Sequence, residues 1–278
     1  MNLTTELAVL WPGEPQQSTI GAQLEWLEQC EPFFRLESSH IGIPLNEWMD
    51  SAFPATIATF CDDIDTRKAV GASLWLKSFS AHLLTGMAAL RLKFARVPCI
   101  TVSQISLEVS SKGKLQRVAI DEDAKFFCLA DDVMADSPLA IVVASEQRLD
   151  QQFALILQQL GDYLAPYYKH ENVSRNLFWG HWGYAVGLSF QKLTQHGSES
   201  TLLETLQPEA DRWLKSLLPN TANLNSVKVA TREPVAIYYI RRETCCLKYK
   251  LDGKKNCATC QLIDPEEQLI RYQSKIPE

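Results

Sequence analysis

Hydrophobic positions in the first hundred residues predict helices. Apolar side chains recur every three to five positions from Arg67 to Phe94, which predicts one long helix with a stripe facing the core. Amphipathic segments at 23–30 and 45–53 predict two shorter helices, and the second should end at Pro54. His82 lies on the long apolar helix, where a histidine is best explained as a core residue bonded to a backbone carbonyl.

The pattern changes after Pro98. Residues 100–109 and 115–120 alternate between apolar and polar and are rich in β-branched side chains, with the turn sequence Ser-Lys-Gly-Lys between them. This arrangement predicts a β-hairpin. A further short strand is predicted over 139–144.

Helical periodicity returns after this strand-rich stretch. Ser145 is a suitable N-cap for a helix that should end near Pro166. Residues 202–218 predict another helix, or two helices broken around Pro208. The compact β-branched and aromatic run at 235–240 predicts a final strand.

This order of elements predicts an α+β fold that is mostly helical, with a central antiparallel sheet. We expect a body over residues 1–240 that is helical over 1–97, strand-rich over 98–144 and helical over 145–234. A short segment, 241–278, follows it and contains the most informative cysteines.

Composition and charge narrow the class of protein. The chain has 278 residues, of which 46% are hydrophobic and 22% charged, as in ordinary globular proteins. The net charge of −6 argues against a nucleic-acid-binding protein. We find no apolar run long enough for a membrane span and no signal peptide, which predicts a cytoplasmic protein. Nothing indicates a large apolar interface, so we expect a monomer.

Four of the eight cysteines form one compact array: Cys245, Cys246, Cys257 and Cys260. Thiolates select zinc, copper(I) or iron–sulfur clusters. Adjacent cysteines point to opposite faces of an extended chain, which suits the wider span of a two-iron cluster better than a single ion. The turn sequence Asp252-Gly253 lets the chain double back between the pairs. Spacing alone leaves zinc and [2Fe–2S] as equal alternatives, with a vicinal disulfide as a third.

The remaining cysteines are scattered among apolar residues at Cys30, Cys61, Cys99 and Cys128. In a reducing compartment, such residues are expected to be small buried hydrophobes.

The pattern Cys-Cys-x10-Cys-x2-Cys, with Arg ahead of the pair and Leu-x-Tyr behind it, resembles the ferric siderophore reductases of the FhuF type. Gln261 stands where many members have proline. The resemblance implies a [2Fe–2S] cluster held by the four cysteines and one-electron reduction of a ferric siderophore. No Gly-rich nucleotide motif is present, so the electron should come from a ferredoxin or a flavoprotein. The competing interpretation is a non-enzymatic siderophore-binding or scaffold protein with a structural zinc site.

Two further features are candidates for docking the substrate or the electron donor. One is a group of basic residues around the cysteines: Arg241, Arg242, Lys248, Lys250, Lys254 and Lys255. Only Glu243 and Asp252 oppose them in this stretch, and cations there favour reduction of an anionic cluster. The other is the aromatic stretch 175–184, in which Trp179 and His181 either line a siderophore pocket or pack a helix into the core.

Overall fold

The computed structural model describes residues 3–8, 19–218 and 222–276. Its helices are α1 (Leu3–Ala8), α2 (Ile20–Cys30), α3 (Leu45–Ser51), α4 (Phe53–Asp63), α5 (Lys68–Phe94), α6 (Glu146–His170), α7 (Arg175–Leu193), α8 (Ser200–Leu217), α9 (Pro265–Gln273) and the 3₁₀ helices η1 (Val102–Gln104) and η3 (Lys248–Lys250). Its strands are β1 (Leu36–Ser38), β2 (Ile43–Pro44), β3 (Val97–Cys99), β4 (Ile105–Val109), β5 (Leu115–Ile120), β6 (Lys125–Leu129), β7 (Ala140–Val143), β8 (Ser198–Glu199), β9 (Asn225–Arg232) and β10 (Val235–Arg242).

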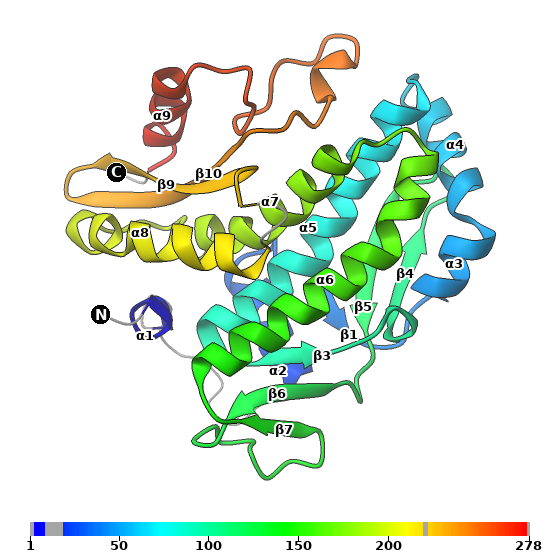
Figure 1. Cartoon of the computed structure of the whole chain (residues 1–278). Helices are drawn as coiled ribbons and strands as arrows, with labels where there is room; N and C mark the ends of the chain where they lie inside the picture. The colour runs from blue at the N-terminus through cyan, green and yellow to red at the C-terminus, as the bar shows by residue number, and fades with distance from the viewer. Residues whose placement is uncertain (1–2, 9–18, 219–221, 277–278) are drawn as a thin grey trace.

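The predicted α+β class is confirmed, with the strands divided among three small sheets. The strand-rich stretch contributes to two of them, ordered β1-β5-β4-β2 and β3-β6-β7. Each of these contains one parallel pair, β1 with β5 and β6 with β7. The third sheet, β8-β10-β9, is antiparallel and belongs to the C-terminal part of the chain (Figure 1).

Helices α5 and α7 form the centre of the molecule (Figure 1). Both are buried around most of their circumference, as expected of helices that other elements surround. Ser174 caps the N-terminus of α7 by accepting a hydrogen bond from the Leu177 amide at 3.3 Å. The two helices position the residues on which the C-terminal segment rests.

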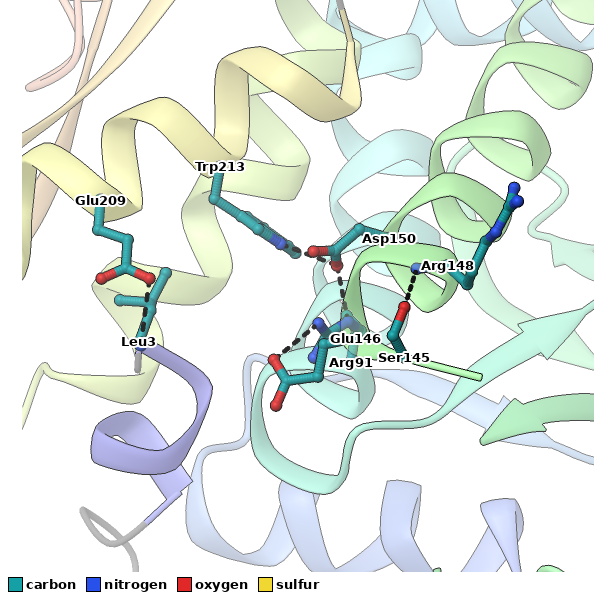
Figure 2. A network of polar contacts seen from close by, with 8 residues as sticks. All are labelled: Leu3, Arg91, Ser145, Glu146, Arg148, Asp150, Glu209 and Trp213. Carbon is teal, nitrogen blue, oxygen red and sulfur yellow. Dashed lines mark hydrogen bonds and ion pairs between the residues drawn. The ribbon is translucent and has the colours of Figure 1, made fainter. Parts of the chain in front are cut away.

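A buried arginine links the long helices of the body (Figure 2). The Arg91 side chain on α5 is 1% exposed, and its Nε lies 2.8 Å from Asp150 Oδ1 on α6. Its Nη2 lies 3.4 Å from Glu146 Oε2, and Trp213 Nε1 on α8 donates to Asp150 at 3.0 Å. Two carboxylates thus offset the cost of burying this guanidinium.

Strand β10 is covered on both faces, which explains its continuous apolar run. Tyr238 belongs to the main core, whereas Tyr239 faces the other way and stacks on Tyr272 of α9 with ring centroids 4.5 Å apart. Helix α9 therefore anchors the end of the C-terminal segment to the sheet.

Three prolines do not act as helix ends in the way the sequence predicted. Pro54 lies in the first turn of α4, where no N–H is required of it. Pro166 and Pro208 lie inside α6 and α8 at exposed positions, so both helices continue while their opposite faces stay packed. Of the two alternatives predicted for residues 202–218, the structure has the single helix.

Most of the other predicted elements are present. The first hairpin strand begins at Ile105 rather than residue 100, because Thr101 and Gln104 form the capping box of η1. His82 is bonded as expected, with Nδ1 2.8 Å from the Ser78 carbonyl oxygen. Residues 1–2 and 9–18 of the predicted helical stretch lie outside the described residues. Within the described ranges, no helix has the length and apolar character to cross a membrane.

Candidate metal centre

The four clustered cysteines lie on the segment that connects β10 with α9 (Figure 1). The chain leaves β10 and crosses α7, where Thr244 rests on Gly180. A Cβ atom at Gly180 would lie 2.2 Å from Thr244 Oγ1, so this contact requires glycine. The segment then forms η3, turns at Gly253 with φ +67°, and returns to the last two cysteines. The predicted reversal at Asp252-Gly253 is thus present.

The four thiols form two pairs across this reversal. The Sγ atoms of Cys246 and Cys257 are 3.6 Å apart, and Cys245 is close enough to Cys260 to raise the pKa of that thiol, after the larger effect of burial. Two sulfurs bound tetrahedrally to one metal at about 2.3 Å stand about 3.8 Å from each other. The adjacent residues Cys245 and Cys246 therefore belong to different pairs. The closer pair, Cys246 and Cys257, has nearly the sulfur–sulfur separation of two ligands on one metal.

Two of the cysteine sulfurs have a hydrogen-bonding partner two positions further along the chain. The Leu247 amide donates to Cys245 Sγ at 3.3 Å, and the Thr259 hydroxyl lies 3.7 Å from Cys257 Sγ. Hydrogen bonds of this kind favour the thiolate and raise the potential of a cluster bound to it. Leu247, which makes the first of these contacts, adopts a left-handed conformation with φ +62°.

The closer pair is electrostatically asymmetric. The pKa of Cys257 lies below the ordinary thiol range, chiefly because the Cys246 thiol donates a hydrogen bond to it and also because Lys77 and Arg242 are positive. The pKa of Cys246 is raised by the same hydrogen bond and by burial. Cys257 is therefore ready to act as a thiolate ligand.

The four thiols stand as two pairs in the structure. Within the described parts of the chain, no three His, Cys, Asp or Glu side chains are grouped as ligands to one metal ion. The thiols are distributed over two positions, as a two-metal cluster with four terminal ligands requires.

A hydrogen-bonded chain connects this segment to the two central helices. Arg242 Nη2 donates to His181 Nδ1 on α7 at 3.2 Å, so the neutral imidazole carries its proton on Nε2. That nitrogen lies 3.0 Å from Ser73 Oγ on α5, which donates to the Cys246 carbonyl at 3.2 Å. Burial, followed by the charges of Arg242 and Lys77, holds the pKa of His181 well below its usual value. His181 thus remains a neutral relay between Arg242 and the cysteine backbone.

Arg242 differs from the other buried arginines in its partners. Its side chain is fully buried, and its Nε and Nη1 groups have no hydrogen-bond partner. Arg91 is paired with Asp150 and Glu146 (Figure 2), and Arg96 is paired with Asp132 at 2.6 Å. No carboxylate of the described residues pairs with Arg242, whose guanidinium instead lies 4.8 Å from the Tyr184 ring.

Burying a guanidinium without a counter-charge costs several kcal/mol, so an anion beside Arg242 is expected. A cluster with four thiolate ligands is anionic and fits this requirement. The thiol pairs, their donors and the buried cation are features expected of an all-cysteine iron–sulfur centre.

Comparison with known families supports this class. The model of the FhuF 2Fe-2S C-terminal domain matches residues 242–260, from Arg242 to the last ligand candidate. This segment is accordingly a FhuF-type domain, and its cofactor is a [2Fe–2S] cluster. A search of curated proteins found no match to the chain.

The structure separates the predicted docking residues into two groups. Lys248, Lys250, Lys254 and Lys255 are exposed, and the half-buried Arg241 contacts Glu243 and Gln268. Arg242 and His181 are fully buried and face the protein interior. Trp179 is 3% exposed and packs on Gly161, although it also lines a pocket of about 720 Å³ between α6 and α7.

Several residues of the site were missed in the sequence. Ser73 and Lys77 are polar positions on the apolar helix α5, and their place beside the cysteines depends on long-range packing. Thr259 stands inside the Cys-Ala-Thr-Cys motif, where its hydroxyl was a usable signal. Thr244 and Gly180 form a contact between distant segments that no local pattern reveals.

Proposed function

We propose that this protein is a ferric siderophore reductase that transfers one electron to an Fe(III)–siderophore and releases Fe(II) in the cytoplasm. The observation that supports this most is the coincidence of the FhuF domain match with the paired thiols. The proposed cluster ligands are Cys245, Cys246, Cys257 and Cys260. When bound, the cluster supplies reversible one-electron chemistry at a potential that its surroundings adjust.

The reaction is balanced by electrons alone. One electron from the donor converts chelated Fe(III) to Fe(II), and no covalent bond of the organic chelator is broken. Hard oxygen ligands hold Fe(III) far more tightly than Fe(II), so the ferrous ion then leaves the chelate. The residues of this chain hold the thiolates in place through Ser73 and His181 and keep the positive charge of Arg242 beside them.

The electron donor is proposed to be a ferredoxin or a separate flavoprotein that docks on the exposed lysines. Lys254 and Lys255 flank the turn of the cysteine segment and are exposed. Reversing both charges should slow electron uptake from an acidic donor, more at low salt than at high salt. Unchanged rates at low ionic strength would show that these lysines have no part in docking.

The decisive experiment is the anaerobic visible spectrum of reduced protein, freed of excess reductant, before and after a ferric siderophore is added. We expect the absorbance of the oxidised cluster to return while Fe(II) appears in a ferrous chelator. The Cys246→Ser variant should lose both signals, whereas Cys99→Ser, which changes a cysteine outside the cluster segment, should keep them. A protein without a visible chromophore at full metal loading would indicate zinc and overturn the proposal.

A further inference from the structure

A cavity of about 360 Å³ opens beside the cysteine segment, between α5, η3 and the loop before β1. Its volume lies in the range of small-ligand sites. Four of its lining residues are basic: Arg35, Lys77, His82 and Lys248. Ser78 and three apolar residues, Phe33, Leu74 and Ala81, form the rest of the wall, and none of the lining residues is acidic.

The positive charge of this cavity is not neutralised by the protein. Among the described residues, no carboxylate forms an ion pair with Arg35, Lys77 or Lys248. Arg35 donates through Nε to the Pro32 carbonyl at 3.2 Å, which fixes the direction of its side chain. Arg35 and Lys248 are exposed and Lys77 is half-buried, so the hollow presents a positive field that attracts anions from solvent.

The cavity shares its wall with the cysteine site. Lys77 of α5 lines the cavity. Lys248, another lining residue, begins η3 two positions after Cys246. Ser73, one turn before Lys77 on α5, holds the Cys246 carbonyl. The cavity wall and the cysteine segment thus meet at Lys248 and at the turn of α5 from Ser73 to Lys77.

We infer that this cavity binds the ferric chelate and that the chelates it accepts are anionic, with carboxylate or catecholate oxygens, in preference to uncharged tris-hydroxamates. The inference rests on the proposed function, since it names the substrate class of the same centre. Oxygen anions satisfy the unpaired guanidinium and ammonium groups through charge-assisted hydrogen bonds. Phe33 offers an apolar surface for the organic part of the ligand.

Binding is tested without electron transfer by titrating cluster-loaded protein calorimetrically with gallium(III) citrate, because gallium does not take up an electron under these conditions. Arg35→Gln and Lys248→Gln should each weaken binding about fivefold, and the double variant more than tenfold, while Lys125→Gln on β6 should have no effect. Gallium ferrichrome, an uncharged tris-hydroxamate chelate, should bind more weakly and respond to none of the variants. Repeating the titration with gallium tris-catecholate, and comparing its affinity with that of gallium citrate, shows whether the cavity prefers catecholate or carboxylate chelates.

The two proposals fail in different ways. Equal gallium citrate binding by wild type and the double variant, or no binding by wild type, would overturn the cavity assignment. Ferric siderophore reduction by the same preparations would leave the proposed function intact. Loss of affinity in the double variant, with the cluster spectrum and potential of the wild type, would support the cavity as the binding site.

Discussion

The buried charge of Arg242 makes a quantitative prediction about the cluster potential. Arg242→Met removes the cation and keeps an unbranched side chain of similar length. Reduction adds one negative charge to the cluster, so losing a nearby cation should lower the potential. For charges roughly 8 Å apart in a medium of effective dielectric constant about 20, the Coulomb energy is about 2 kcal/mol. At 59 mV for each tenfold change of a one-electron equilibrium, this corresponds to a decrease of about 90 mV.

The assay is an anaerobic redox titration followed by visible absorbance, which reports the potential and does not depend on turnover. Arg242→Lys keeps the charge but loses the hydrogen bond to His181, so we expect a much smaller decrease. Arg241→Gln is the control variant at the neighbouring position, because Arg241 is half-buried and its charge is already paired with Glu243. We expect its potential to lie close to that of the wild type.

Two results would refute this reasoning. A potential of the Met variant within about 20 mV of the wild type would show that the charge of Arg242 is screened from the cluster. Equal decreases in the Met and Lys variants would show that the hydrogen bond to His181, rather than the charge, sets the potential.

Three further predictions concern the contacts between the cysteine segment and the central helices. Ser73→Ala leaves buried polar groups unsatisfied at a cost of about 1–3 kcal/mol, so the cluster should be lost to a chelator faster than in the wild type. The loss is followed as the decrease of the visible absorbance of the cluster. Ser80→Ala is the control, because Ser80 is a buried serine on the same helix that is bonded only to its own helix. Gly180→Ala should displace Thr244 and lower the iron content of purified protein, and normal iron content would contradict this contact. The neutral His181 is protonated only on unfolding, so stability should fall by up to about 1.4 kcal/mol per pH unit below about pH 6.5. His181→Gln should weaken this pH dependence in urea denaturation, and an identical slope would show that the imidazole already titrates in the folded state.

The sequence predicted the elements whose signals are local. Periodicity identified α5 almost to its ends, and Ser145 correctly marked the start of α6. The cysteine spacing and the turn at Asp252-Gly253 predicted a folded-back segment, which the structure contains. These features depend on residues that are close together in the chain, so a short stretch of sequence is enough to predict them.

The surroundings of the cysteines depend on packing between distant segments and were not predicted. Arg242 was expected among the docking residues, and His181 was expected either to line a pocket or to pack into the core. Both lie in the interior and bond each other, a contact that the sequence did not predict. Their partner Ser73 is more than a hundred residues away from either of them in sequence. The mixed sheets were missed for the same reason, because the parallel pair β1–β5 joins segments on either side of α5.

The unmatched guanidinium of Arg242 also bears on how the protein matures. Anything that binds only the folded state stabilises it by mass action, and here the bound group also supplies the anion that the buried cation lacks. We expect the segment after β10 to open more often, and to be cut sooner by proteases, in molecules that have not received their cluster. The lifetime of the protein in the cell would then depend on the supply of iron and sulfide. Molecules without a cluster would be degraded before they could bind an electron donor unproductively.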